Sequence, residues 1–168
     1  MRNPTRTLLA AVLTLALAAT GAPPAGATEW RSWDEGIEKA RAQRRPMVVD
    51  VYTDWCGWCK RMDADVYARK DVSDYLASRF VSVKLNAESS QTVHFDDRPI
   101  TSRSLAGNFK VTGYPTTVFL NAKGERLANV PGYIPADRFL MLLRYIGEGD
   151  MDRGVKWDDF VARQPKAK

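Results

Sequence analysis

The sequence predicts an α/β protein with a mixed central sheet and helices on both faces, and three observations support this fold class. Two strand-like runs, 47–53 and 80–85, are separated by helix-like segments, as in parallel strands joined by crossover helices. A hairpin follows, in which the turn 121–124 joins two further strands, 116–120 and 125–130. An amphipathic helix completes the pattern. Because crossover strands run parallel and hairpin strands antiparallel, a sheet that contains both is mixed.

The first half of the chain alternates helices with strands. Ser32 and Glu35 have the spacing of a capping box, so a helix is expected from about 32 to 43. The next run, 47–53, is strongly apolar around one aspartate, and it should be buried on both faces of the sheet. The remaining elements predicted in this half are helices over 60–67 and 71–79 and a strand over 80–85, whose side chains alternate in polarity.

The second half begins with a polar stretch, 87–99, which shows no periodicity and is predicted to be a loop. It contains the only histidine, His94, which we expect at the surface. A helix over 100–109 and the hairpin follow. The last long helix has Pro135 in its first turn and apolar residues at i, i+3, i+4 and i+7. One short helix, 157–163, is expected to dock its apolar residues on the body of the protein.

The first 27 residues have the three parts of a secretory signal peptide. Arg2 and Arg6 precede an apolar run, and a segment of small residues ends at Ala27, where cleavage is expected. The apolar run is shorter than the roughly 20 residues that a membrane-spanning helix needs. The sequence therefore predicts export to the periplasm with no membrane span after cleavage, and it divides into a signal peptide over 1–27, a domain over 28–150 and a polar tail over 151–168.

The distribution of charge argues against one broad class of function. The chain carries a formal net charge of +5, but its basic residues are interspersed with acidic ones. Proteins that bind nucleic acids typically show a basic patch or stripe on one face. The sequence has no basic stripe with interleaved aromatic residues, so we predict no nucleic-acid partner.

Both cysteines of the chain, Cys56 and Cys59, lie in a C-x-x-C motif between the strand 47–53 and the following helix. A thiol at the start of a helix is close to unpaired N–H groups and to the positive end of the helix dipole, which stabilise a thiolate. A second thiol one turn later can resolve a mixed disulfide formed on the first. The motif therefore predicts redox chemistry, with Cys56 as the nucleophile and Cys59 as the resolving thiol.

Three alternatives compete with redox chemistry at this motif. A structural disulfide is disfavoured because so short a loop gains little entropic stabilisation. A structural zinc site takes four protein ligands, and only His94 is available beside the two thiols, so no metal ligands are predicted. Copper(I) accepts two soft thiolates, so a copper carrier stays open, although no methionine cluster accompanies the motif.

The residues around the motif resemble the thioredoxin-like superfamily. The segment 48–60 is similar to the thioredoxin active-site segment, 111–116 to the second active-site loop, and 119–125 to the hairpin that follows it. The resemblance covers about 32–146 and implies a thioredoxin fold. The long polar stretch, a Pro-Gly break and the tail look more like exported bacterial members. These include thioredoxins encoded with sulfur-oxidation systems and the C-terminal domain of the transmembrane disulfide reductase.

The resemblance assigns roles to two residues near the dithiol. Asp50 matches an acid that lies beneath the dithiol in thioredoxin and assists proton transfer at the resolving cysteine, and burial would raise its pKa toward the range of a general base. The alternative is that Asp50 faces solvent from a strand end. Pro115 matches the cis proline of the family, which would turn the backbone of Tyr114 toward an extended client segment that pairs like an added strand.

Residues around the dithiol are also predicted to bind the client. Trp55 and Trp58 would flank the cysteines as an apolar contact surface, although ordinary packing is the alternative for both. The dipeptide Gly57-Trp58 departs from the Gly-Pro of thioredoxin, and since this dipeptide influences the reduction potential, the redox direction stays open. The complete set of predicted substrate-binding residues is Trp55, Gly57, Trp58, Tyr114 and Pro115.

The sequence thus favours an exported thiol–disulfide oxidoreductase that reduces protein disulfides and uses no cofactor beyond its own Cys56–Cys59 pair. Its expected partners are a disulfide-bearing client protein and a membrane dithiol that donates electrons. A disulfide oxidase, a copper(I) carrier and a peptide-binding module on the same fold are the alternatives, because a fold does not fix a function.

Overall fold

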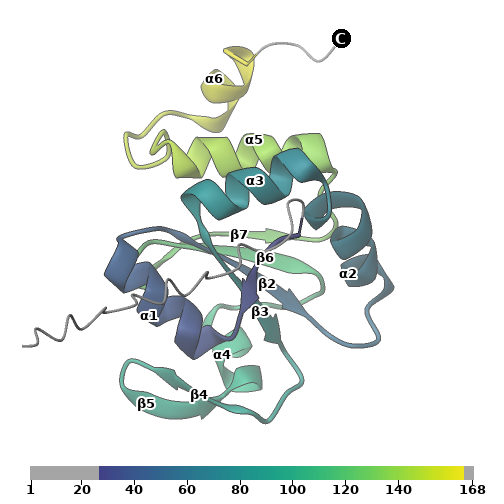
Figure 1. Cartoon of the computed structure of the whole chain (residues 1–168), viewed down its shortest axis with the longest axis vertical. Coiled ribbons are helices and arrows are strands. Elements are labelled where there is room, and N and C mark those ends of the chain that lie inside the picture. The colour runs from purple at the N-terminus through teal and green to yellow at the C-terminus, as the bar shows by residue number, and fades with distance from the viewer. Residues whose placement is uncertain (1–26, 165–168) are drawn as a thin grey trace, which may run out of the picture.

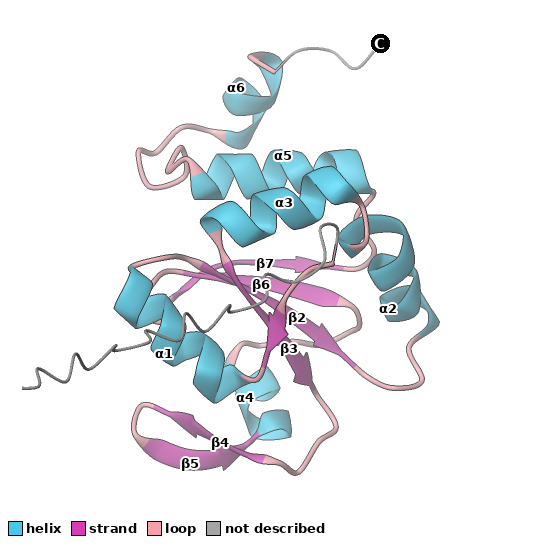
Figure 2. Ribbon diagram, viewed as in Figure 1, coloured by secondary structure: helices cyan, strands magenta, loops and turns pink. Residues whose placement is uncertain are grey.

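A five-stranded mixed sheet forms the centre of the protein (Figures 1 and 2). The computed structural model describes residues 27–164, so the expected signal peptide lies outside the described residues except for Ala27. The strands are β1 (Trp30–Arg31), β2 (Met47–Tyr52), β3 (Val81–Asn86), β6 (Thr116–Leu120) and β7 (Arg126–Pro131), in the order β1-β3-β2-β6-β7. The first three run parallel, and β6 and β7 are antiparallel to their neighbours. The predicted mixed sheet is therefore confirmed.

Helices cover both faces of this sheet, as predicted. In the described part of the chain they are α1 (Trp33–Gln43), α2 (Gly57–Met62), the π-helical turn η1 (Asp63–Tyr67), α3 (Lys70–Arg79), α4 (Ser102–Asn108), α5 (Ala136–Gly147) and α6 (Trp157–Ala162). Side chains of α1 and α4 form the core on one face, and side chains of α3, α5 and η1 form the core on the other (Figure 2). No helix among residues 27–164 is both long and apolar enough to cross a membrane.

Strand β2 lies between these two cores and is almost entirely buried, which confirms the expectation for this apolar run. Val49 and Val51 belong to the core under α1, whereas Val48 belongs to the core under α3 and α5. Because side chains alternate along a strand, Asp50 points to the same face as Val48. This register places the only charged side chain of β2 under α2 and η1.

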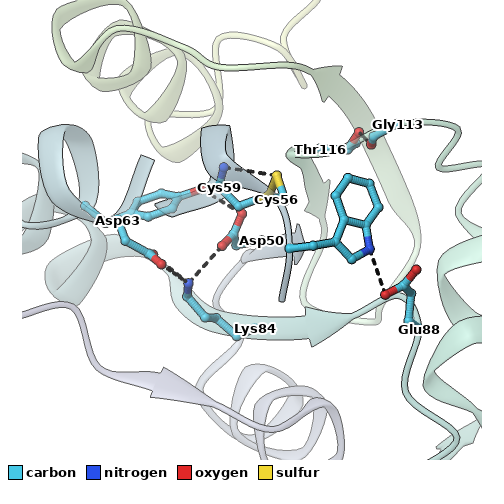
Figure 3. The surroundings of a disulfide bond; sticks show 10 residues. Asp50, Cys56, Cys59, Asp63, Lys84, Glu88, Gly113 and Thr116 are labelled. Atoms are coloured by element: carbon cyan, nitrogen blue, oxygen red, sulfur yellow. Dashed lines mark hydrogen bonds and ion pairs between the residues drawn. A yellow bond between two sulfur atoms is a disulfide. The ribbon is translucent and has the colours of Figure 1, made fainter. Parts of the chain in front are cut away.

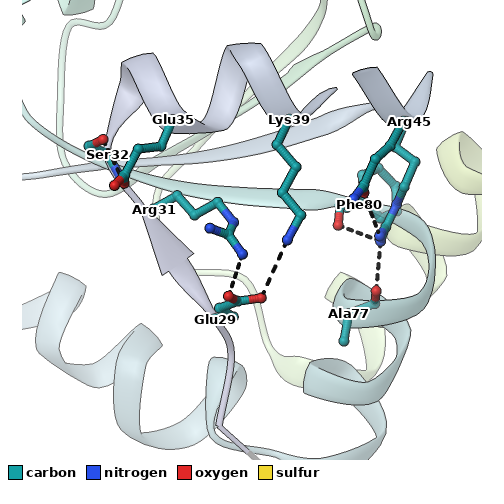
Figure 4. Close-up of polar contacts among 9 residues, drawn as sticks. Glu29, Arg31, Ser32, Glu35, Lys39, Arg45, Ala77 and Phe80 are labelled. Atoms are coloured by element: carbon teal, nitrogen blue, oxygen red, sulfur yellow. Dashed lines mark hydrogen bonds and ion pairs between the residues drawn. The ribbon is translucent and has the colours of Figure 1, made fainter. Parts of the chain in front are cut away.

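Charged side chains connect β1 to α1, and the end of α1 to the end of α3 (Figure 4). Glu29, just before β1, forms ion pairs with Arg31 and with Lys39 of α1, the latter at 3.7 Å. The guanidinium of Arg45 donates hydrogen bonds to the carbonyl oxygens of Ala77 and Phe80, at 2.7 and 2.6 Å. Strand β1 has only two residues, and the sequence analysis did not find it.

The predicted loop 87–99 is wrong in its second half. This stretch forms a separate two-stranded hairpin with β4 (Thr92–Phe95) and β5 (Arg98–Thr101). Asp96 and Asp97 form its turn with positive φ angles of 51° and 60°, a conformation that aspartate tolerates better than most residues. Val93 is buried against α1. The strands are short and their turn is polar, so the alternation of apolar and polar residues was not recognised in the sequence. Because β5 extends to Thr101, the helix expected over 100–109 begins only at Ser102.

The expected short helix in the tail is present as α6, and it docks on α5 as predicted. Phe160 is buried, and its ring centroid lies 5.2 Å from that of Tyr145 on α5. The hydroxyl of Tyr145 also donates a hydrogen bond to the carbonyl of Val155 at 2.5 Å. Aromatic packing and one partly buried hydrogen bond therefore hold the tail against the body.

A helix cap offers a test of how β5 passes into α4. The hydroxyl oxygen of Thr101 accepts a hydrogen bond from the backbone N–H of Ser104 at 3.1 Å. We expect Thr101→Ala to lower the free energy of unfolding by about 1 kcal/mol, because an N–H at the helix start loses its partner. Urea unfolding measures this loss. Thr101→Ser keeps the hydroxyl and should stay close to wild type, and an equal loss in both variants would contradict the capping role.

Candidate active site

The two cysteines lie at the start of α2, where the strand β2 leads into a helix, as predicted. They form a disulfide with an S–S distance of 2.09 Å. Cys56 is the N-cap residue, and its sulfur accepts a hydrogen bond from the backbone N–H of Cys59 at 3.1 Å. Cys56 is 4% exposed and Cys59 is 2% exposed. The first cysteine is therefore the one beside the free N–H groups of the helix start, where a thiolate is stabilised.

Asp50 lies fully buried on β2, which rules out the solvent-facing alternative. Figure 3 draws its carboxylate between the ammonium group of Lys84 and the sulfur of the disulfide. The hydroxyl of Tyr67 donates a hydrogen bond to one carboxylate oxygen at 3.2 Å. Burial raises the pKa of Asp50 to about 6, against the opposing effect of the nearby Lys84 ammonium. A carboxyl group with this pKa exchanges its proton near neutral pH.

Lys84 and Asp63 complete a charged cluster that the sequence analysis missed. Lys84 is directly opposite Asp50 in the parallel register of β2 and β3, and its ammonium nitrogen lies 3.2 Å from Oδ2 of Asp50. The geometry of this ion pair is not that of a hydrogen bond, since Oδ2 accepts none from the described residues. The same ammonium donates to both oxygens of Asp63, at 2.5 and 2.7 Å. Lys84 therefore links a buried carboxylate to a half-exposed one.

The charges of this cluster also affect one another. Burial lowers the pKa of Lys84, but the carboxylates of Asp50 and Asp63 outweigh it, and the net shift is upward. Burial raises the pKa of Tyr67 well above its usual value, so this hydroxyl stays a neutral donor. Lys84 was expected only as a polar residue of an alternating strand. Only the strand register, which the sequence does not state, could have paired it with Asp50.

The loop with the cis proline, which was predicted to bind the client, lies directly before the start of β6. The Tyr114–Pro115 peptide bond is cis. The hydroxyl of Thr116 donates to the carbonyl of Gly113 at 2.7 Å, and the N–H of Gly132 donates to the carbonyl of Pro115 at 2.8 Å (Figure 3 shows the first contact). These bonds fix the loop from both of its flanks.

Trp55 and Trp58 are the two large apolar side chains that the described surface leaves exposed, at 66% and 56%. The ring of Trp55 meets Tyr114 edge-on at 6.0 Å between centroids, and its indole N–H donates to Glu88 at 2.9 Å. The ring of Trp58 lies 5.5 Å from that of Tyr133. Neither tryptophan is therefore part of the core, and each forms an aromatic pair at the surface next to the C-x-x-C motif.

Other predicted positions behave more simply. Gly57 is exposed, and a side chain added there would meet no atom within 4 Å. His94 is at the surface as expected, with its imidazole 3.1 Å from Asp34 of α1, so it belongs to the contact between α1 and the β4–β5 hairpin. Among residues 27–164, no group of three or more His, Cys, Asp or Glu side chains could hold a metal ion. Tyr133 and Glu88 are site residues that the sequence analysis did not single out.

The sheet order, the disulfide at the start of α2 and the cis proline just before β6 can be compared with known proteins. The model of the family described as the thioredoxin-like domain matches residues 33–147. The protein belongs to this thioredoxin-like family. Among solved structures, this thioredoxin-like protein is similar to a thioredoxin from Thermus thermophilus, with a TM-score of 0.62 and 25% identity over 76% of this chain and 93% of that one. A thioredoxin-fold protein from Helicobacter pylori gives a TM-score of 0.61 at 23% identity, covering 72% and 80%.

Two curated relatives carry names from disulfide chemistry. The disulfide bond reductase DsbH of Chlamydia pneumoniae is 25% identical over 108 residues, which cover 64% of this chain and 64% of DsbH. The thiol:disulfide interchange protein DsbD of Ralstonia nicotianae is 31% identical over 116 residues, which cover 66% of this chain and only 17% of DsbD. The match therefore spans a small part of DsbD. The expected likeness to the transmembrane disulfide reductase is confirmed, and the likeness to sulfur-oxidation-associated thioredoxins stays a prediction.

Proposed function

We propose that this thioredoxin-like protein is an exported thiol–disulfide oxidoreductase that reduces disulfides of client proteins in the periplasm. The observation that carries the proposal is the Cys56–Cys59 disulfide at the start of α2 with the buried carboxyl group of Asp50 behind it. The names of the relatives DsbH and DsbD support the same chemistry. Export rests on the signal-peptide pattern of residues 1–27.

The reaction starts from the reduced dithiol. The thiolate of Cys56 attacks one sulfur of the client disulfide, a bond forms between these two sulfurs, and the other client sulfur leaves as a thiolate. Asp50 then accepts the proton of Cys59, and the resulting thiolate attacks the sulfur of Cys56. The mixed disulfide breaks and the second client sulfur leaves as a thiolate. Two electrons have moved to the client, and the protein holds the disulfide seen in the structure.

The surface around the disulfide fits an extended client segment. In this proposal, the backbone beside the cis proline Pro115 would pair with such a segment as with an added strand. Exposed aromatic rings are favoured anchors at protein interfaces. The pairs Trp55–Tyr114 and Trp58–Tyr133 would hold client side chains on either side of the attacked disulfide.

After each cycle the protein must be reduced again, and no cofactor beyond its own dithiol is needed for this step. A membrane protein that exposes a dithiol is the proposed donor, in keeping with the similarity to a part of DsbD. The donor thiolate would attack the Cys56–Cys59 disulfide and reverse the exchange described above. A soluble client and a membrane donor would then use the same exposed surface in turn.

The reduction potential of the Cys56–Cys59 couple tests the direction of electron flow. We expect a value near that of thioredoxin, about −270 mV, because a protein that reduces client disulfides must hold its own dithiol at a low reduction potential. Equilibration with glutathione at known ratios, followed by acid quenching and thiol counting, measures it. A value near about −120 mV, that of the oxidant DsbA, would instead identify a disulfide oxidase.

A further inference from the structure

A hollow lies beside the charged cluster of Asp50, Lys84 and Asp63. It has a volume of about 360 Å³ and is lined by Ala27, Thr28, Trp30, Asp63, Tyr67, Ala68 and Lys84. Asp50 is fully buried, whereas Lys84 and Asp63 reach the wall of this hollow. The N-terminal segment forms another part of the wall, and the hydroxyl of Thr28 donates to the carbonyl of Tyr67 at 3.0 Å. Strand β1 therefore borders the side from which water approaches the cluster.

Trp30 of β1 contacts both groups that hold the carboxylate of Asp50. Its ring face lies over the ammonium group of Lys84, 5.2 Å from nitrogen to ring centroid. Its ring also meets Tyr67 in a T-shaped contact at 4.8 Å. Lys84 lies 3.2 Å from one oxygen of Asp50, and Tyr67 donates to the other. A single indole thus supports both partners of the buried acid.

We propose that Trp30 is a positioning residue for Asp50 and that it acts by holding the ammonium group of Lys84 against the carboxylate. This inference rests on the proposed function insofar as it assigns a role to proton transfer at Asp50. A cation over an indole face is held by the negative charge of the ring face. Tyr52 supplies a second ring on the same ammonium at 5.0 Å. The two rings hold the ammonium group between them. Lys84 therefore stays close to Asp50 and does not pair with Asp63 only.

The charged and titratable groups that face Asp50 determine whether its pKa should rise or fall when Trp30 is replaced. Lys84 approaches from β3, Asp63 and Tyr67 approach from η1, and the cysteines of α2 are in a disulfide and do not titrate. The ammonium lowers the pKa of Asp50, and the negative charge of Asp63 raises it. If Lys84 loses the ring of Trp30, its pairing with Asp63 at 2.5 Å draws it outward. The carboxylate of Asp50 then loses stabilisation, and its pKa rises.

The test compares Trp30→Leu with Trp30→Phe in the whole oxidised protein. Leucine keeps an apolar side chain over the cluster but has no ring face, whereas phenylalanine keeps both. The carboxyl carbon of Asp50, followed by NMR over a pH series, should titrate about half a pH unit higher in Trp30→Leu, as expected for the loss of one aromatic face. Trp30→Phe should titrate as wild type does. This readout needs no enzymatic activity, so it stands even where the proposed reductase activity fails.

A double-mutant cycle shows whether the effect passes through Lys84. In a Lys84→Met background, adding Trp30→Leu should not change the pKa of Asp50 any further. An unchanged titration in Trp30→Leu, an equal shift in Trp30→Phe, or a full shift in the Lys84→Met background would each overturn the proposal. For the function, the pH midpoint of insulin reduction should move upward with the NMR titration. A loss of rate at every pH without such a movement would indicate a merely structural role and count against it.

Discussion

Cys56→Ser should lower the rate of insulin reduction by on the order of 10³-fold or more, because a serine hydroxyl does not ionise near neutral pH and cannot attack a disulfide. In the structure, Cys56 is the N-cap of α2 and the more exposed cysteine of the pair. The measurement is the turbidity of reduced insulin in the presence of dithiothreitol. A variant that reduced insulin at the wild-type rate would contradict the assignment of Cys56 as the nucleophile.

Cys59→Ser provides the matched control for this prediction. It keeps the nucleophile and removes the resolving thiol, so the mixed disulfide with the client should accumulate rather than disappear. Non-reducing electrophoresis detects this species as a band that dithiothreitol removes. Cys56→Ser should show no such band. If the two variants behaved in reverse, Cys59 would be the attacking residue.

Asp50→Asn should increase the free energy of unfolding at pH 7 by about 3 kcal/mol, because the native carboxyl group is ionised there at a buried site. The pKa of Asp50 is raised from 3.8 to about 6 by burial. Asparagine has the same shape, keeps an acceptor for the hydroxyl of Tyr67, and carries no charge. Lys84 retains its ion pair with Asp63 at 2.5 Å, so the substitution does not leave it alone.

The pH dependence of this gain has a definite sign. Below about pH 4 the carboxyl group is protonated in both the folded and the unfolded protein, so wild type and Asp50→Asn should be equally stable. Between pH 4 and 6 the unfolded protein loses the proton first, and wild-type stability falls as pH rises through the folded pKa of about 6. Urea unfolding at a series of pH values measures the difference. A gain that persisted at pH 3 would come from another cause.

The same variant should be slower in catalysis. Without a base at position 50, the proton of Cys59 has no acceptor behind the disulfide, and resolution of the mixed disulfide should fall on the order of 10²-fold. In the wild type, we expect the rate to rise near pH 6 as Asp50 loses its proton and becomes a base. This rise should be absent from Asp50→Asn. Asp63→Asn is the matched control, because it removes a half-exposed carboxylate from the same cluster and leaves the buried one in place. A variant that is both more stable and less active would show that the buried charge of Asp50 costs stability and serves catalysis.

Local signals in the sequence were sufficient for most of the fold and for the centre of the site. The capping box placed α1, the C-x-x-C motif placed the start of α2, and the apolar run around Asp50 showed that a charge was buried. The resemblance to thioredoxins supplied the cis bond at Pro115. In each of these cases, the relevant residues are close together in the chain or match a known motif. The helix expected over 60–67 was placed too late, because α2 begins at Gly57 and ends at Met62, where the π-helical turn η1 takes over.

Features that depend on tertiary contacts were missed. Strand β1 has two residues and exists only because β3 is beside it. The link from Asp50 to Lys84 requires the register of two parallel strands, and Asp63 joins it only through a π-helical turn. The β4–β5 hairpin buries a single valine on its first strand, which is too little for a periodic pattern. Such contacts cannot be read from spacing along the chain.

Strand β7 is one of the two outer strands of the central sheet, and its composition bears on self-association. An unpaired strand edge can template pairing with another molecule, and bulges, charged residues and proline oppose this. β7 begins with an exposed Arg126, ends with an exposed Pro131, and pairs with β6 through a register shift near Phe119. At high protein concentration, the exposed arginine, the proline and the register shift therefore disfavour pairing of β7 with a strand of another molecule.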